Sequence, residues 1–246
     1  MANINTDLQA YRDLKTSGKI LRNILNNLKV SVKIGTNLLE IEKIVNENIT
    51  KQHAIASFKD YDGFPSSVCL SVNETIVHGI PYNYSIKSGD LVSIDLGIIY
   101  NNMFTDGAIT LNFSRDIKDK ILCQVTQKAL SNAIKIIKPG IKTGDLGNII
   151  AQTAESANVK VIHDLTGHGT GSAVHEKPTI YNFGIKKHGV EIKAGDILAI
   201  EPMFAFKSEK IAKNKNKWSI KTINNDKSAH FEHTVFVTQK GAEIIT

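Results

Sequence analysis

Residues 87–95 read Lys-Ser-Gly-Asp-Leu-Val-Ser-Ile-Asp, and residues 193–201 read Lys-Ala-Gly-Asp-Ile-Leu-Ala-Ile-Glu. Each stretch is a turn followed by a strand pattern, and each ends on a carboxylate, Asp95 or Glu201, where the next apolar residue belongs. Burying a carboxylate after an apolar strand is costly unless a positive group compensates it. The repeat therefore predicts two half-folds that face each other, with a metal between the matched acids.

Two further pairs of segments repeat in the same order. Residues 29–35 resemble residues 138–144, and each precedes a segment with helical spacing of apolar residues. His78-Gly-Ile-Pro81 and His175-Glu-Lys-Pro178 both place a histidine three residues before a proline. Half-units of about 110 residues are too long for the repeats of a solenoid. The repeats therefore indicate one duplicated domain over residues 1–246, with approximate half-repeats 1–112 and 113–246 about a pseudo-two-fold axis.

The composition is that of a globular protein. Hydrophobic residues make up 41% of the chain, which is enough for a sizeable core, and no apolar run approaches the roughly 18 residues that span a bilayer. The N-terminal segment is charged rather than apolar, so no secretory signal is expected. The two cysteines, Cys69 and Cys123, do not make a disulfide framework. We expect a reduced, cytoplasmic protein that does not enter a membrane and is a monomer.

Positive charge is concentrated in one segment. Lysine and arginine number 30 and the acids 24, for a formal net charge of +6. Much of the excess comes from six lysines: Lys207, Lys210, Lys213, Lys215, Lys217 and Lys221. A solvated surface loop explains this cluster, and a docking site for an anionic partner such as ribosomal RNA is the alternative.

Apolar periodicity predicts helices and antiparallel strands in both halves. Helices are expected over about 8–28, 37–49 and 117–137 and from about 145, and strands over about 66–77, 91–112, 159–163, 196–204 and 230–238. A capping box, Thr6-Asp7-Leu8-Gln9, precedes the first helix. Asn101-Asn102 tolerates positive φ and splits the longest strand segment into a hairpin. These elements predict an α+β fold in which helices cover antiparallel sheet.

The hairpin brings two aspartates onto one face of the sheet. If Asn101-Asn102 is a two-residue turn, Asp95 lies opposite Ala108, and Asp106 shares the face of both because it is two residues from Ala108. Such diagonal neighbours lie roughly 7–8 Å apart, so their carboxylates can converge on two cations about 3.5–4 Å apart. Two solvated acids are the alternative, which the apolar residues around Asp95 disfavour.

Three more groups extend the set. Glu201 precedes Pro202 at a strand end, Glu232 lies in a largely apolar strand, and His168 lies in the glycine-rich turn 166–171, where the glycines allow close backbone approach. Four carboxylates and an imidazole suit two divalent ions of the Co, Mn, Fe or Zn type. A structural zinc site needs cysteine and histidine spacings that the chain lacks.

His78 and His175 occupy matched positions in the two repeats. We expect both to reach the same cleft from opposite sides, where they would hydrogen-bond the carbonyl and amide groups of a substrate. Taken singly, each histidine is equally compatible with a structural role.

Seven motifs, in this order, resemble those of type I methionine aminopeptidases of the short bacterial kind. They cover nearly the whole chain: Ser71–Pro81, Ser93–Gly97, Phe104–Ala108, Gly167–Gly171, His175–Pro178, Ile200–Met203 and Phe231–Thr234. The resemblance implies the internally duplicated pita-bread (creatinase/aminopeptidase) fold, and removal of the initiator methionine from nascent polypeptides.

The resemblance also implies a role for each site residue. The ligands of two metal ions would be Asp95, Asp106, His168, Glu201 and Glu232, with Asp106 and Glu232 bridging the ions. A metal-bridging hydroxide would attack the methionine carbonyl, with small second residues favoured. Glu201 would also shuttle a proton, while His78 would lie near the scissile amide and His175 near its carbonyl oxygen.

A methionine pocket is implied as well, with Tyr61, Phe64, Cys69 and Trp218 as its walls. Cys69 would act as a small, soft hydrophobe beside the thioether rather than as a nucleophile. Ordinary core packing is the alternative for Tyr61 and Phe64.

Two residues depart from the family pattern, and both concern the shape of the pocket. Phe58 stands where a cysteine is usual, and Val174 stands where an aromatic residue commonly precedes the His-Glu-x-Pro motif. The resemblance further implies a monovalent cation bound by backbone carbonyls near Asn73, Thr75 and Ser228.

Two other functions are alternatives. Peptidases of the X-Pro aminopeptidase or prolidase type use the same five ligand types, but they usually carry a separate N-terminal domain. A binding module that kept this fold without its chemistry would have lost ligands, whereas all are present here. We therefore expect a single catalytic domain that acts on the N-termini of nascent chains, with the Lys207–Lys221 segment as a possible ribosome contact.

Overall fold

The computed structural model describes residues 8–246, so Thr6 and Asp7 of the expected capping box lie outside the described part. Its helices are α1 (Leu8–Ser31), α2 (Leu38–Lys51), α3 (Ile117–Ile136) and α4 (Thr143–Glu155), with a 3-10 turn η1 (Tyr61–Gly63). Within these residues, no helix combines the length and the apolar character needed to cross a bilayer.

The strands of the first half are β1 (Ile55–Ala56), β2 (Cys69–Val72), β3 (Thr75–Val77), β4 (Leu91–Tyr100) and β5 (Met103–Asn112). Those of the second half are β6 (Lys160–Val161), β7 (Thr166–Gly169), β8 (Glu176–Tyr181), β9 (Ile197–Ile200), β10 (Met203–Ala205), β11 (Ile211–Lys213), β12 (Ile220–Thr222), β13 (Ser228–His230), β14 (His233–Val237) and β15 (Ala242–Ile244). Every strand pair described is antiparallel. The α+β prediction is confirmed.

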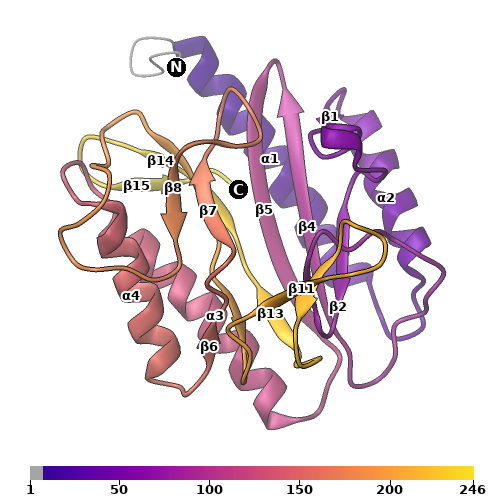
Figure 1. Cartoon of the computed structure of the whole chain (residues 1–246). Helices are drawn as coiled ribbons and strands as arrows, with labels where there is room; N and C mark the ends of the chain where they lie inside the picture. Colours follow the sequence, from indigo (N-terminus) through magenta and orange to yellow (C-terminus); the bar gives the residue numbers. More distant parts are fainter. Residues whose placement is uncertain (1–7) are drawn as a thin grey trace.

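The β4–β5 hairpin has the longest strands of the first half (Figure 1). Its ladder runs from Leu91 opposite Asn112 to Tyr100 opposite Met103. Asn101 and Asn102 form the turn with φ of 46° and 62°, the left-handed values of a type I′ turn. The predicted turn and register are therefore confirmed. The other edge of β4 pairs with β1 and β2.

Helices α1 and α2 cover this sheet with their apolar faces. Leu21 and Leu28 of α1 belong to the same buried cluster as Ile94 and Leu96 of β4. At Gly18, a Cβ atom would lie 2.3 Å from the carbonyl oxygen of Ile245. The C-terminal end of the chain therefore packs directly on the backbone of α1, at a position where only glycine leaves room.

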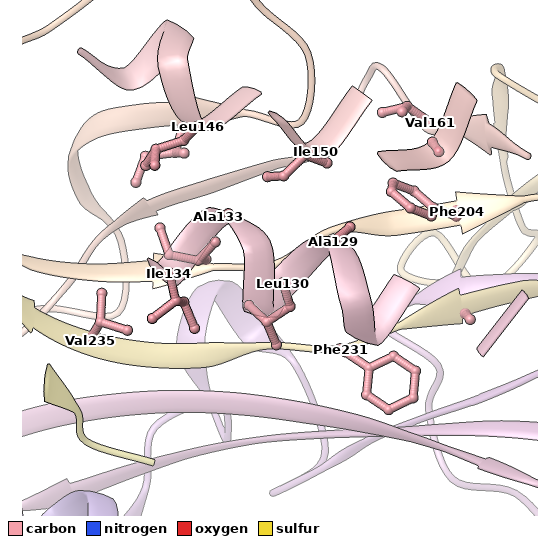
Figure 2. Close-up of a cluster of buried hydrophobic side chains, with 14 of the residues drawn as sticks. Ala129, Leu130, Ala133, Ile134, Leu146, Ile150, Val161, Phe204, Phe231 and Val235 are labelled. Atoms are coloured by element: carbon pink, nitrogen blue, oxygen red, sulfur yellow. The ribbon is translucent and has the colours of Figure 1, made fainter. Parts of the chain in front are cut away.

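The second half repeats this arrangement with α3 and α4. Its largest sheet has the order β15-β14-β9-β7-β8. Figure 2 shows the core between these elements, where Leu130 and Ile134 of α3 lie between α4 and the strand that carries Val235. Phe204 and Phe231 belong to the same buried cluster. Each half thus has a large apolar core of its own. Two smaller buried clusters join the halves, one that contains Leu14 and Phe236 and one that contains Ile76 and Met203.

The halves meet along β5 and the segment before β14. Glu232 N donates to Ala108 O at 2.9 Å, and Ala108 N donates to Glu232 O at 3.4 Å. Beside this pair, Asp106 N donates to Thr234 Oγ1 at 2.8 Å, and the Thr234 hydroxyl donates to Asp106 O at 2.8 Å. These bonds fix one acid of each half at the junction.

Three of the predicted strands are broken in the structure, the first of which, residues 66–77, divides into β2 and β3 at Asn73-Glu74. Residues 196–204 divide into β9 and β10 at Glu201-Pro202, and residues 230–238 divide into β13 and β14 at Phe231-Glu232. At these points both segments switch from one sheet to another, since β10 pairs with β13 and β9 with β14, and Pro202 has no N–H to continue a ladder. The prediction that Glu232 lies within a strand is therefore wrong.

His168 lies in strand β7 rather than in a turn, which corrects the expectation from its glycine-rich setting. A Cβ atom at Gly167 would lie 2.4 Å from Ala199 O, and one at Gly169 would lie 2.3 Å from Lys177 O. The glycines therefore serve close approach of neighbouring strands, as expected, but in a sheet.

Candidate metal centre

A cavity of about 600 Å³ is lined by every residue expected from the sequence to be a divalent-metal ligand, a catalytic group or a wall of the methionine pocket. Both halves contribute to its lining, which includes Tyr61, Phe64, Cys69, His78, Asp95, Asp106, His168, His175, Glu201, Trp218 and Glu232. Phe58 and Val174, the two departures from the family pattern, line the same cavity. Residues far apart in the chain are thus brought to one place.

The four acids of the cavity are buried. Asp95 lies on β4 and Asp106 on β5, and Ala108 lies opposite Asp95 as the hairpin predicts. Glu201 follows β9 directly, and Glu232 separates β13 from β14. None of the four acids is more than 9% exposed. Acids packed together away from water cannot all stay ionised unless cations accompany them.

The pKa values of these acids show how unfavourable it is to ionise them together. Burial, followed by repulsion from the neighbouring acids, raises the pKa values of Asp95, Glu201 and Glu232 well above their usual range. Burial also raises the pKa of Asp106 to about 7, although the Gly107 N–H donates to its Oδ1 at 2.9 Å and opposes the rise. Without a cation, the cluster therefore favours protonated acids at neutral pH.

The donor atoms fit a divalent metal. Asp95 Oδ1 and Glu232 Oε1 are buried and have no hydrogen-bond partner within residues 8–246. Asp106, His168 and Glu232 each offer a ligand atom, and these atoms lie within 4.8 Å of one another. Oxygen donors with an imidazole are the ligands of Mn, Fe, Co and Zn in catalytic sites. A divalent ion would satisfy the orphaned oxygens and neutralise the acids.

His168 is held in the orientation that a metal ligand needs. Its Nδ1 lies 2.9 Å from Gly169 O, which favours a proton on Nδ1 and leaves the Nε2 lone pair free. Nε2 lies 3.4 Å from Glu201 Oε1. Burial lowers the pKa of His168 to about 4, so the ring is neutral at pH 7.

A further histidine, His230, lies against the acids and was not singled out from the sequence. Its Nε2 is 3.3 Å from Glu201 Oε2 and 3.9 Å from Glu232 Oε2. The side chain is buried, and burial lowers its pKa to about 3. The sequence contains only a weak signal, its position two residues before Glu232, because the chain between these residues is not part of a strand.

His78 and His175 enter the cavity from different halves. His175 Nδ1 lies 3.2 Å from the Tyr61 hydroxyl, and the ring centroids of His175 and His168 are 4.4 Å apart. Burial lowers the pKa of both His78 and His175 below the usual value. Both rings are therefore neutral at pH 7 and able to donate or accept one hydrogen bond at each nitrogen.

The residues expected to form the methionine pocket all line the cavity. Phe64 and Trp218 meet edge to face, with ring centroids 5.3 Å apart. Cys69 is buried on β2, directly opposite Asp95 of β4. Burial, and then the charge of Asp95, raises the pKa of the Cys69 thiol well above its usual value. The thiol is therefore protonated and behaves as a soft apolar group.

The lysine-rich segment 207–221 is not simply a loop, since it contains β11 and the start of β12, which pair with each other. Five of its six lysines are exposed, and Lys221 is partly buried. Trp218, which lines the cavity, lies in the connection between the two strands. We name residues 207–222 the basic hairpin, which adjoins the cavity through Trp218.

The groups expected to bind a monovalent cation also lie together. The Ser228 hydroxyl is 3.1 Å from Asn73 O and 3.2 Å from Thr75 O.

Comparisons with known proteins agree with this site. The sequence pattern of metallopeptidase family M24 matches residues 12–239. The methionine aminopeptidase of Mycoplasma capricolum is 39% identical over 97% of this chain and 96% of its own length. The crystal structure of methionine aminopeptidase from Thermotoga maritima has a TM-score of 0.94 and 38% identity, and covers 96% of this chain and 95% of that one.

More distant structures share the fold alone. The prolidase of Pyrococcus furiosus has a TM-score of 0.77 at 21% identity, and this chain covers 64% of its length. The pita-bread fold is thus confirmed, while the much higher identity to methionine aminopeptidases sets the prolidase alternative aside. The chain therefore belongs to metallopeptidase family M24, as an aminopeptidase of the methionine aminopeptidase group.

Proposed function

We propose that this protein removes the N-terminal methionine from newly made polypeptides with the help of two divalent metal ions. The observation that carries the proposal is the meeting of four buried acids and His168, from both halves of the chain, in one cavity. The similarity to methionine aminopeptidases over nearly the whole chain supports the choice of substrate. Residues 1–246 would act as a single catalytic domain.

The proposed ligands are the five groups expected from the sequence: Asp95, Asp106, His168, Glu201 and Glu232. Cobalt, manganese, iron and zinc all suit this donor set. When bound, the ions would supply an activated water and polarise the scissile carbonyl. Ser228 and the carbonyls of Asn73 and Thr75 are proposed to hold a monovalent cation.

The chain's own groups would handle the protons and the substrate. Glu201, a buried carboxylate among the proposed ligands, is also the proposed proton shuttle, as the resemblance to methionine aminopeptidases implies. His175, whose Nδ1 faces Tyr61, would present Nε2 to the carbonyl oxygen of the substrate. His78 would approach the scissile amide from the other half.

Selectivity would come from the aromatic wall. Phe64, Trp218 and the protonated Cys69 offer apolar, polarisable contacts that suit a thioether. We also propose a preference for small second residues. Phe58 and Val174 line the same cavity and would set its width.

The test is metal-dependent release of methionine. Protein stripped with a chelator should be inactive on a Met-Ala-Ser peptide, and anaerobic reconstitution with cobalt, manganese, iron or zinc should restore activity. An X-Pro peptide and an N-acetylated Met-Ala-Ser peptide are the controls. Cleavage of the X-Pro peptide in preference to Met-Ala-Ser, or equal activity without metal, would contradict the proposal.

The basic hairpin is proposed to contact ribosomal RNA. Five of its six lysines are exposed, and clustered lysines bind phosphates electrostatically. The hairpin adjoins the cavity through Trp218, so contact with RNA would hold the cavity close to an emerging nascent chain. Changing Lys210, Lys213, Lys215 and Lys217 to Gln should weaken co-sedimentation with ribosomes. The matched control carries the same change at four exposed lysines of α3: Lys118, Lys120, Lys128 and Lys135. Equal binding of both variants would remove the idea.

A further inference from the structure

His230 is a buried histidine without an evident partner. Its side chain is 1% exposed, and neither ring nitrogen has a hydrogen-bond partner within residues 8–246. Leaving a buried polar group unpaired costs about 1–3 kcal/mol. The ring nitrogens of His230 therefore need a hydrogen-bond or metal partner, and residues 8–246 do not supply one.

The backbone aims this ring at the acids. Phe231 points into the core beneath α3 (Figure 2), whereas the neighbouring His230 points to the acids, with its Nε2 3.3 Å from Glu201 Oε2. The position is firmly held, because His230 N donates to Thr110 Oγ1 at 2.9 Å and the Thr110 hydroxyl donates to His230 O at 2.8 Å.

The distances around Glu201 place its carboxylate between two imidazoles. Oε1 lies 3.4 Å from His168 Nε2, and Oε2 lies 3.3 Å from His230 Nε2. His230 Nε2 also lies 3.9 Å from Glu232 Oε2. Ligand atoms about 2.1 Å from a tetrahedral ion are about 3.4 Å apart. The distances from His230 Nε2 to the two carboxylates are therefore close to the distance between two ligand atoms of one ion.

A direct hydrogen bond does not account for this spacing. Although His230 Nε2 is 3.3 Å from Glu201 Oε2, the ring N–H is not aligned to donate to it. With the proton on Nδ1 instead, the Nε2 lone pair would face carboxylate oxygens, and in the ionised form of the acids, which metal binding requires, this contact is repulsive unless a cation lies between them. Glu201, His230 and Glu232 each offer a ligand atom, and these atoms lie within 4.8 Å of one another.

We propose that His230 is a second histidine ligand of the metal centre and binds, through Nε2, an ion that it shares with Glu201 and Glu232. The inference rests on the proposed metal centre and adds a sixth donor group to it. A second imidazole favours zinc, cobalt and iron over manganese, which prefers oxygen ligands. His230 would therefore help to set which metal the protein selects.

The experiment is a cobalt titration of the chelator-stripped full chain, followed by visible absorption and calorimetry. Absorption of Co²⁺ reports its donor atoms and coordination number. The test variant is His230→Gln, which keeps a polar side chain but lacks the imidazole. His233→Gln is the matched control, since His233 is a nearby, largely buried histidine whose Nδ1 instead faces Thr246 Oγ1 at 3.1 Å.

We expect His230→Gln to change the cobalt spectrum and to weaken binding of one ion by about tenfold or more, with His233→Gln like the wild type. An unchanged spectrum overturns the inference, even if affinity falls, because the residue would then only position Glu201. Failure of the wild type to bind cobalt at all would overturn the metal centre itself and the inference with it.

A measurement on the unmodified protein covers the case in which the variant does not fold. Imidazole ¹⁵N signals of the wild type, followed during titration with Zn²⁺, should show a large shift at Nε2 of both His168 and His230. A shift at His168 with none at His230 would leave the metal centre standing and refute the proposed sixth ligand.

Discussion

His78 reaches the cavity from an unusual backbone position, with a φ of 56°. Its carbonyl oxygen accepts a hydrogen bond from the Ser219 hydroxyl at 3.2 Å, and a Cβ atom at the next residue, Gly79, would lie 2.1 Å from Leu70 O. The main chain at this point is therefore closely packed on both sides. Such support is what a side chain needs if it must hold a fixed direction toward a substrate.

We expect His78→Asn to retain both metals and to lose about 10²-fold or more of kcat, because the imidazole is proposed to act on the scissile amide. Asparagine is chosen since it tolerates a left-handed backbone better than alanine does. Metal content by inductively coupled plasma spectrometry and peptide kinetics are the measurements. Loss of a metal equivalent would instead make His78 a ligand.

Asp106 makes the stability of the metal-free protein depend on pH. Its pKa is raised to about 7 in the fold, against about 3.9 in an unfolded chain, so the folded state holds its proton more tightly. The stability associated with that proton is complete below about pH 4 and is lost as the pH rises through about 7.

In the Asp106→Asn variant, residue 106 has no carboxyl proton to lose, so its contribution to stability should not fall as the pH rises. In the presence of a chelator, we expect its Tm to exceed that of the wild type at pH 8 and the difference to shrink toward pH 4. Scanning calorimetry at several pH values measures both. With metal present, the order should reverse at pH 8 because the variant has lost a ligand. A difference in Tm that is independent of pH would refute this account.

Single residues also show where sequence reasoning ends. The acids were recognisable because a charge at the end of an apolar run is conspicuous. His230 was not, since a lone imidazole in an apolar stretch is equally common as a packed core residue. Only its distances to Glu201 and Glu232 distinguish it.

At the level of secondary structure, the Asn101-Asn102 turn controls the hairpin. Both residues have positive φ, and a two-residue turn of this type fixes which residues pair in the flanking strands. The position of Asp106 relative to Asp95 follows from that register.

We expect Asn102→Ala to lower the free energy of unfolding by about 1 kcal/mol, because a Cβ without a compensating polar group is strained in the left-handed region. Asn102→Gly should be neutral or slightly stabilising. Urea unfolding followed by circular dichroism compares the two variants with the wild type. Equal stability of the alanine and glycine variants would show that the turn does not demand positive φ.

The hairpin could be predicted because its information is local, in two adjacent asparagines and the alternation around them. The breaks at Glu201 and Glu232 could not, because they arise from sheets that exchange partners. Pairing of β9 with β14 and of β10 with β13 depends on segments that meet only in the folded chain. The periodicity of apolar residues within one segment does not predict that the segment will switch from one sheet to another.

Across the whole molecule, the proposed metal ligands come from both halves. Asp95 and Asp106 come from the first half, and His168, Glu201 and Glu232 from the second. The repeats in the sequence predicted that two halves face each other. Some of the contacts that set their orientation, such as those between Ala108 and Glu232, are main-chain hydrogen bonds, which do not depend on residue type and could not be predicted from the sequence.

Metal should therefore stabilise the entire chain rather than one half. At a free metal concentration of about 100 Kd, binding contributes about 2.7 kcal/mol, which corresponds to a rise in Tm of roughly 5–10 °C for a chain of this size. Thermal unfolding with cobalt or with a chelator measures it, and Glu232→Gln should show a much smaller rise. Two separate transitions, of which metal moves only one, would contradict this coupling.

The packing of Ile245 against Gly18 bears on how the protein should be handled. Ile245 and Thr246 are 2% and 3% exposed, and the Thr246 hydroxyl oxygen accepts a hydrogen bond from Thr234 N at 3.0 Å. A purification tag fused after Thr246 would start from a buried residue beside the strand that follows Glu232. Placing the tag ahead of α1, whose first residue Leu8 is 71% exposed, would leave the contacts of Ile245 and Thr246 undisturbed.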